Sequence, residues 1–415
     1  MRILFYCDEY PPAPHGGIGR VTQIVAEALA VRGHYVMVAG YNALFQPDKA
    51  SISSQTDILQ NGVHTYRLVS NRLYSNRLVI WKSLLTVSQI INFSFFIKRM
   101  RFLIAKQKLH LTEQWIAQII DQQKIDVLEI IDYQDAIRHD LTYPITFRRF
   151  QVPTVMRVHG SCSFIYHFGE GTIPTNIFMN DRNSFQRVDA ICAVSGFSAQ
   201  FVTENLHPSV PVEVIYNPVE MKLFGHLKPY PEPIRILFFG KISRTKGTFT
   251  LIQAFNKLAS IHPMIELHLI GYGELETAEK LIDSLNKNRV IIKSFMNQEA
   301  LMAEIDQAYL CALPSYFENF SMAALEVMAR RRALFYSTRS SGPELIVDGE
   351  TGWLADPENV EELVAKIDWA LRNREATIAV AQRGFDHCFA HFSTDKIIPQ
   401  LEKFYEQLIR EGIHQ

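Results

Sequence analysis

Several patterns that mark common functional classes are missing from this sequence. There is no Cys-x-x-Cys pair, and the histidines have no ligand-like spacing, so no structural zinc site is expected. There is no Gly-x-Gly-x-x-Gly fingerprint, which argues against a dinucleotide-dependent dehydrogenase. No Asp-x-Asp pair, low-complexity region or short repeat occurs. These absences leave an ordinary globular protein with no bound metal or cofactor expected.

An excess of charge of either sign is also missing. Lys and Arg total 42 against 43 Asp and Glu, so net charge gives no reason to expect a nucleic-acid partner. The five cysteines are scattered, mostly in apolar runs, and are expected to be reduced. Met1 leads directly into a strand-like run, which predicts no signal peptide and a cytoplasmic location.

The length and two similar apolar openings indicate two domains. A chain of 415 residues suits two domains of ordinary size. Residues 2–7 and 235–240 each read as a buried strand followed by a loop, a helix and another strand, which is the βαβ pattern. Asn217-Pro218 and the prolines of 227–233 read as a linker. The sequence therefore predicts an α/β fold of two doubly wound domains with a boundary near residue 218.

A pair of carboxylates, Glu318 and Glu326, is the most informative feature of the second half. A short strand precedes them, Pro314 ends it, and Ser321 is placed to cap the helix that carries Glu326. That helix is apolar almost all round, so Glu326 is expected to be poorly solvated and to need a partner such as a hydroxyl pair. From these residues alone, a solvated Glu318 and an ordinary ion pair at Glu326 are equally acceptable.

Polar or glycine-rich loops follow several predicted strands. Ligands of open α/β sheets bind at the carboxyl ends of the strands, so these loops are candidate sites. A solvated surface or a simple turn is the competing interpretation for each loop, and a structural role for the histidine. The loops hold glycines Gly16 and Gly17, cations Lys241 and Lys246, the Gly271 and Gly273 pair, Met296 and His159.

Taken together and in this order, these segments resemble the large "group one" family of retaining nucleotide-sugar glycosyltransferases, which has the GT-B fold. The resemblance spans nearly the whole chain and is strongest over residues 235–357. It implies that Glu318 holds hydroxyls of the donor sugar and that Glu326 holds the ribose of the nucleotide. His159 would lie beside the transferred sugar, and we take His159 and Glu318 as the candidate catalytic residues.

The resemblance also implies how the donor diphosphate is held. Gly16 and Gly17 would reach over it, and Lys241 and Lys246 would clamp it. Lys241 stands where the family has Arg, which replaces a bidentate fork by a point charge. The remaining donor-binding candidates are Gly271 and Gly273 near the nucleotide, Met296 in the loop that packs on the base, and the amides of Phe320, Ser321 and Met322.

The resemblance implies a domain arrangement, a pair of substrates and a biological role. Two Rossmann-like domains would face a cleft: residues 1–218 on the acceptor side and 219–394 on the donor side, with a C-terminal helix, 395–415, packing back on the first. The substrates would be a UDP-sugar and a glycan or lipid-linked acceptor, in cell-surface polysaccharide or glycolipid synthesis, with no bound metal. A nucleotide-sugar epimerase of the same fold and a noncatalytic nucleotide-sugar binding protein are the alternatives.

Residues 84–108 belong to no motif of this family. They combine an apolar run, too short and too polar to span a bilayer, with Lys98, Arg99 and Arg101. A basic amphipathic helix of this kind can lie on an anionic membrane surface, which would place the protein on the inner face of the membrane. The competing interpretation, which we slightly favour, is a helix that covers the sheet of the first domain.

Overall fold

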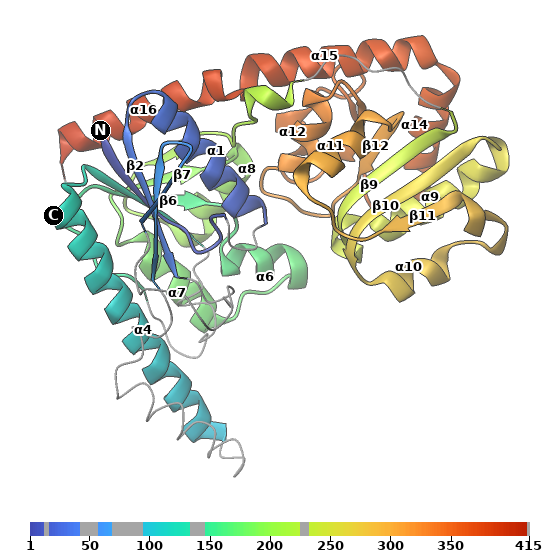
Figure 1. Ribbon diagram of the computed structural model, residues 1–415. Coiled ribbons are helices and arrows are strands. Elements are labelled where there is room, and N and C mark those ends of the chain that lie inside the picture. Colours follow the sequence, from blue (N-terminus) through green and yellow to red (C-terminus); the bar gives the residue numbers. More distant parts are fainter. Residues whose placement is uncertain (12–15, 42–56, 69–93, 133–145, 225–231, 413–415) are drawn as a thin grey trace, which may run out of the picture. The chain divides into compact units, whose positions relative to one another are not determined.

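The structure is a computed structural model that describes residues 1–11, 16–41, 57–68, 94–132, 146–224 and 232–412. The chain divides into two compact units (Figure 1). The first comprises Met1–Tyr216 and Ile398–Gln415, and the second comprises Asn217–Ile397. The proline-rich linker predicted at 227–233 lies largely outside the described residues.

The first unit is built on an eight-stranded sheet of order β3-β4-β2-β1-β5-β6-β7-β8. All neighbouring strands are parallel except β3 and β4. The strands are β1 Arg2–Tyr6, β2 Tyr35–Tyr41, β3 Asp57–Gln60, β4 Val63–Leu68, β5 Val127–Ile131, β6 Thr154–Val158, β7 Ala190–Ala193 and β8 Val212–Val214. Strands β1, β5, β6 and β7 are buried almost throughout, as expected for a parallel sheet with both faces covered.

Helices alternate with these strands. They are α1 Gly17–Val31, α4 Ser94–Gln123, α6 Cys162–Glu170, α7 Thr175–Phe185, α8 Gly196–Phe201 with the π-turn η1 Val202–Leu206, and α16 Thr394–Glu411. The C-terminal helix α16 packs back on this unit. Its Tyr405 hydroxyl donates to buried Glu129, and Arg32 forms a bidentate pair with Glu402 at 2.7 Å for both bonds.

The second unit contains a six-stranded, all-parallel sheet of order β11-β10-β9-β12-β13-β14. Its strands are β9 Ile234–Ile242, β10 Ile265–Gly273, β11 Val290–Lys293, β12 Leu310–Leu313, β13 Ala333–Ser337 and β14 Trp353–Ala355. Its helices are η2 Met221–Leu223, η3 Arg244–Lys246, α9 Thr248–Ile261, α10 Leu275–Leu281, η4 Ser284–Arg289, α11 Gln298–Asp306, α12 Met322–Ala329, α13 Gly342–Leu345, α14 Val360–Arg372 and α15 Arg374–Phe392. Helix α9 packs with α14, and α12 packs with α15 and β13.

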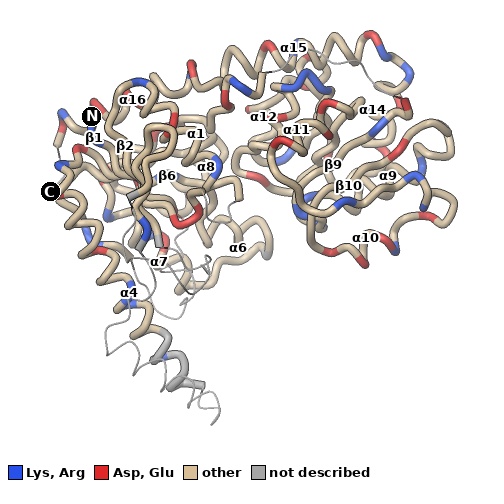
Figure 2. The backbone as a smooth tube through the Cα atoms, viewed as in Figure 1, with Lys and Arg blue, Asp and Glu red and all other residues tan. Residues whose placement is uncertain are grey.

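The fold agrees with the sequence prediction of two α/β units with doubly wound, Rossmann-like sheets. Both signs of charge are interspersed along each unit (Figure 2). The four cysteines Cys7, Cys192, Cys311 and Cys388 are buried, Cys162 is partly exposed, and all five are free thiols. Burial raises the pKa of Cys7 and of Cys192 to about 12, so these thiols are unreactive core groups.

Candidate functional site

Two loops at the carboxyl edge of the second sheet lie against each other. The loop after β9 passes through η3 to Gly247, and the backbone N–H of Tyr316, in the loop after β12, donates to the carbonyl of Thr245 at 2.9 Å. Gly247 has φ +70, and an added Cβ would lie 1.8 Å from the carbonyl oxygen of Pro314. Only glycine fits this close approach, which brings the predicted cationic loop against the predicted carboxylate loop.

Lys246 and Glu318 meet where these loops join. The Lys246 ammonium donates directly to the Glu318 carboxylate. Their side chains are 34% and 26% exposed, so both remain accessible to a ligand. Sequence reasoning predicted a ligand role for each residue but not their contact, because the two stand 72 positions apart in the chain.

Glu326 is buried on α12, as the apolar surroundings predicted. It is 7% exposed, and the amide Nε2 of Gln298 donates to its Oε1 at 2.9 Å. Gln298 is the first residue of α11 and follows the loop that carries Met296. No role was predicted for Gln298. The signal available in the sequence was its place two residues after Met296, in the loop expected to lie near the nucleotide.

The start of α12 lies beside these carboxylates. Ser321 caps the helix, because its hydroxyl accepts the N–H of Ala324 at 3.2 Å, which confirms the predicted cap. The first N–H groups of a helix have no partner within the helix, so the amides around Phe320 and Met322 are suited to meet an anion. Phe320 itself is buried, with its ring 5.4 Å from that of Phe392.

Lys241, Gly271 and Gly273 occupy strands and not loops. Strand β9 continues to Ile242, which places exposed Lys241 opposite Tyr272 of β10. The tight turn considered as an alternative for the two glycines is wrong, because β10 continues through both of them. An added Cβ would lie 1.8 Å from the Gly240 carbonyl oxygen at Gly271 and 2.3 Å from that of Ile242 at Gly273. Both glycines therefore allow the two backbones to approach at the strand ends.

In the first unit, His159 follows the last residue of β6. The backbone N–H groups of His159 and Gly160 both donate to the carboxylate of Asp132, each at 2.9 Å. Asp132 directly follows β5, and sequence reasoning missed it. A carboxylate directly after the strand-like run 127–131, which is apolar except for Glu129, was the signal that could have identified it. Burial raises the pKa of Asp132 to about 7, although the two N–H donors favour the ionised carboxylate.

The imidazole of His159 is uncharged at neutral pH. Burial, and then the nearby Arg157 guanidinium, lower the pKa of His159 to about 3. Arg157 is itself buried and paired with Glu129 at 2.7 and 3.1 Å. Nε2 of His159 is buried and has no hydrogen-bond partner among the residues that the structure describes.

Gly16 and Gly17 begin helix α1 in the same unit. Gly16 is the N-cap residue, and its N–H donates to the Glu9 carboxylate at 3.2 Å. An added Cβ at Gly17 would meet no atom within 4 Å. The structure thus shows no steric requirement for glycine at Gly17, and the neighbouring His15 lies outside the described residues.

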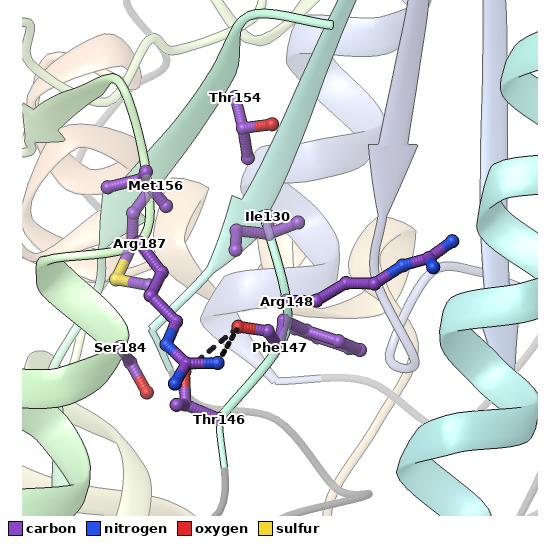
Figure 3. A pocket seen from close by; sticks show the side chains of 9 residues that line it. Ile130, Thr146, Phe147, Arg148, Thr154, Met156, Ser184 and Arg187 are labelled. Atoms are coloured by element: carbon purple, nitrogen blue, oxygen red, sulfur yellow. Dashed lines mark hydrogen bonds between the residues drawn. The ribbon is translucent and has the colours of Figure 1, made fainter. Parts of the chain in front are cut away.

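A pocket in the first unit lies beside α7 (Figure 3). Arg187 points toward Phe147 and donates to its carbonyl oxygen at 3.5 Å. Thr154 and Met156, which also line the pocket, are the first and third residues of β6, whereas His159 follows the end of that strand. The pocket therefore belongs to the packing of α7 on the sheet and not to the strand tips where His159 lies.

Within the described ranges, no group of three or more His, Cys, Asp or Glu side chains is arranged to hold a metal ion. None of the helices in those ranges has the length and apolar character needed to cross a bilayer.

Comparison with known protein families gives two adjoining matches. Residues 221–386 match the family described as "Glycosyl transferases group 1", and residues 94–223 match "Glycosyltransferase Family 4". A glycogen synthase from Mycobacterium tuberculosis is 24% identical over 381 residues, which cover 88% of this chain and 85% of the relative. A lipopolysaccharide 1,2-N-acetylglucosaminetransferase from Salmonella typhimurium is 25% identical and covers 61% of this chain and 72% of its own length.

Solved structures show the same fold. A sucrose-phosphate synthase from Thermosynechococcus elongatus superposes with a TM-score of 0.75 at 18% identity, covering 99% of this chain and 100% of the other. The Anabaena protein HepE, in complex with UDP-glucose, superposes with a TM-score of 0.68 at 18% identity, covering 98% of this chain and 100% of the other. The chain therefore belongs to the group 1 glycosyltransferases, enzymes that use nucleotide-sugar donors, and has the GT-B fold.

Proposed function

We propose that the protein is a retaining glycosyltransferase that moves a sugar from a UDP-sugar to a hydroxyl group of a glycan or lipid-linked acceptor. The observation that carries this proposal is the contact between Lys246 and Glu318, together with buried Glu326 on α12, the helix that follows the Glu318 loop. The cation suits the phosphates of a nucleotide-sugar donor, and the two carboxylates suit the hydroxyls of its sugar and of its ribose. UDP is favoured as the nucleotide because HepE was solved with UDP and with UDP-glucose.

The second unit would hold the donor. Glu326, fixed by Gln298, would accept hydrogen bonds from the two ribose hydroxyls. Lys246 and Lys241 would bind the diphosphate, helped by the backbone amides of residues 320–322 at the start of α12. These groups stabilise the negative charge that develops on the leaving diphosphate, and they do so without reorganising during the reaction.

The transfer itself would occur on one face of the sugar. The bond between the anomeric carbon and the diphosphate oxygen breaks, and the acceptor oxygen attaches to the same face. The leaving phosphate oxygen takes the proton of the acceptor hydroxyl, so no separate nucleophile is needed. Glu318 would orient the sugar through its hydroxyls, and neutral His159, held by Asp132, would contribute a polar contact from the first unit.

We further propose that the reaction needs no metal ion and serves the synthesis of a cell-surface polysaccharide or glycolipid. Support for the biological role comes from relatives named for lipopolysaccharide and amylovoran synthesis. A cytoplasmic enzyme bound at the inner face of the membrane through the start of α4 would suit a lipid-linked acceptor. Along α4, Ile104, Ala105 and Leu109 are buried, so this part of the helix covers the first unit, as the core interpretation expected.

One product analysis tests the reaction type. Proton NMR of the product formed from an α-linked UDP-sugar should show an α-linked product at early times, and chelator should leave the rate largely unchanged. A β-linked first product would overturn the retaining mechanism, and a strict need for Mg²⁺ or Mn²⁺ would overturn metal independence. Conversion of the donor sugar in the absence of any acceptor would instead favour an epimerase.

A further inference from the structure

Asn319, between Glu318 and Phe320, is an unusual buried residue. It is 7% exposed, and neither Oδ1 nor Nδ2 of its amide has a hydrogen-bond partner in the part of the chain that the structure describes. Buried polar side chains are nearly always paired, because an unpaired amide loses its hydration without compensation. A residue with both ends of its amide unpaired therefore calls for an explanation.

The backbone on both sides of Asn319 is held by side chains. The N–H of Glu318 donates to the hydroxyl of Ser340 at 3.2 Å, and Nδ2 of Asn217 donates to the carbonyl of Phe320 at 3.4 Å. Buried Ser341 adds a longer bond, 3.4 Å, from its hydroxyl to the Glu318 carbonyl. Three side chains thus hold the backbone around Asn319 by hydrogen bonds. The side-chain amide of Asn319 makes none of these bonds.

Ser340, which holds the Glu318 backbone, has an unfavourable backbone conformation. It adopts a φ of +57, in the left-handed region that is unfavourable for residues other than glycine, asparagine and aspartate. Strained backbone of this kind is typical of functional sites, where the surrounding contacts maintain it. The strain occurs in the residue whose hydroxyl holds Glu318.

The chemistry of Asn319 suits a neutral, hydroxyl-bearing ligand. A carboxamide offers one acceptor and two donor hydrogens and carries no charge, so it can pair with hydroxyl groups, which both donate and accept. The adjacent charges of Lys246 and Glu318 already contact each other. An amide next in the chain to Glu318 could therefore add polar recognition of a sugar without adding charge.

We propose that the Asn319 side chain binds hydroxyl groups of the donor sugar and helps to determine which sugar is accepted. This inference rests on the proposed function, in which Glu318 contacts the same sugar. A site built to hydrogen-bond a hydroxyl discriminates against a sugar that lacks it or presents it in the other configuration, because the amide is then left buried and unpaired.

The test compares Asn319→Leu with the wild type in two measurements. Thermal unfolding without ligand should occur at the same or a higher temperature, since an unpaired buried amide is replaced by an apolar side chain of similar size. Calorimetry should give a Kd for UDP within about twofold of the wild type. The Kd of the sugar nucleotide preferred in a panel of UDP, GDP and ADP sugars should rise about tenfold, as expected for one or two lost hydrogen bonds.

Asn359→Leu is the matched control. Asn359 belongs to the same unit, but its side chain caps α14 by accepting the N–H of Glu362 at 3.0 Å. This variant should unfold at a lower temperature and keep the wild-type ratio of the two Kd values. If leucine at position 319 prevents folding, Asn319→Ala allows the same comparison of the two Kd values.

The inference on Asn319 would be overturned by an unchanged ratio of the Kd values for UDP and its sugar nucleotide, whether both affinities are kept or both fall by the same factor. A wild-type protein that binds neither UDP nor any sugar nucleotide would refute the proposed function itself. The two failures are therefore distinguishable.

Discussion

At the scale of single residues, the Lys246–Glu318 contact determines what a substitution should do. We predict that Glu318→Gln lowers kcat by about 100-fold, because a charged contact to the sugar is lost. The Kd for UDP should stay the same or fall, since Lys246 is released from its carboxylate partner. Steady-state kinetics and calorimetry check the two effects. Full activity of the variant would remove Glu318 from the site.

The two predicted lysines should differ in their tolerance of change. Lys246→Ala should lower kcat/KM by about 100-fold or more, because a positioned cation near the developing phosphate charge is removed. Lys241→Arg should stay within a few-fold of the wild type, because exposed Lys241 has room for a larger cation. Steady-state measurement of kcat/KM for the two variants tests this difference. Equal losses would contradict the assignment of Lys246 as the principal phosphate contact.

His159 should make the protein less stable in acid. Its pKa is lowered to about 3 in the folded protein by burial and Arg157, whereas it is about 6.5 in the unfolded chain. The stabilisation that results from this pKa difference is fully present above pH 6.5. As the pH falls from 6.5 toward 3, the free energy of unfolding decreases by about 1.4 kcal/mol per pH unit. The free energy of unfolding, measured by urea denaturation between pH 5 and 8, should therefore change less steeply with pH for His159→Gln than for the wild type.

The same substitution at exposed His110 serves as the control for loss of a histidine. If His159→Gln and the wild type lose stability in parallel, the pKa of His159 is the same in the folded protein as in the unfolded chain. His159 stays neutral between pH 6 and 8, so its titration should not contribute to the pH–rate profile of the wild-type enzyme in that range.

At this scale, the sequence was enough to predict the burial of Glu326 and the helix cap at Ser321, but not the partners of the site residues. Burial of Glu326 followed from its apolar neighbours, and the cap at Ser321 followed from the helix start. The sequence did not reveal Asp132, Gln298 or Ser340, because each forms its hydrogen bond with a residue of a different segment. Such pairing depends on tertiary structure.

At the scale of elements, strand and helix types agreed with prediction and their bounds shifted. Strands β9 and β10 run further than the apolar pattern indicated, because Gly271 and Gly273 permit close pairing where turns were considered. The helix expected over 84–108 is described only from Ser94, as α4, and it runs on to Gln123. Its continuation could not be read from the basic run, because several of its buried apolar residues, among them Trp115, Ile116 and Ile119, lie beyond residue 108.

Helix α4 allows a direct test of the membrane proposal. Wild-type protein should float with anionic liposomes and not with neutral ones, since each surface-proximal Lys or Arg adds about 1 kcal/mol of attraction. Charge reversal at Lys98, Arg99 and Arg101 should abolish flotation and leave thermal unfolding unchanged. The control variant reverses an equal number of exposed charges elsewhere, at Lys124, Lys280 and Lys287.

Equal flotation of the two variants would refute a specific role for the start of α4. Helix α4 would then serve only to cover the sheet of the first unit, and a soluble acceptor would be favoured.

At the scale of the whole molecule, two α/β units could be predicted because the βαβ pattern occurs twice. The family could be predicted because its motifs follow one another in order through the chain. The sugar, the base and the acceptor could not be predicted, because they are selected by the shape of a pocket and by backbone contacts. Asn319 is an example, since its burial, and the absence of a hydrogen-bond partner for its amide among the described residues, are visible only once the loops around it are placed.

The central claim is that the second unit binds a nucleotide-sugar donor through its paired carboxylates. Calorimetric titration of wild type and Glu326→Ala with a panel of UDP, GDP and ADP sugars tests it most directly. We predict that the wild type binds one nucleotide class, UDP in the first place. The variant should bind the same nucleotide more weakly by about 1.5–3 kcal/mol, because hydrogen bonds to a charged group are lost. Binding of no sugar nucleotide by the wild type, or equal affinities of the two proteins, would contradict the account.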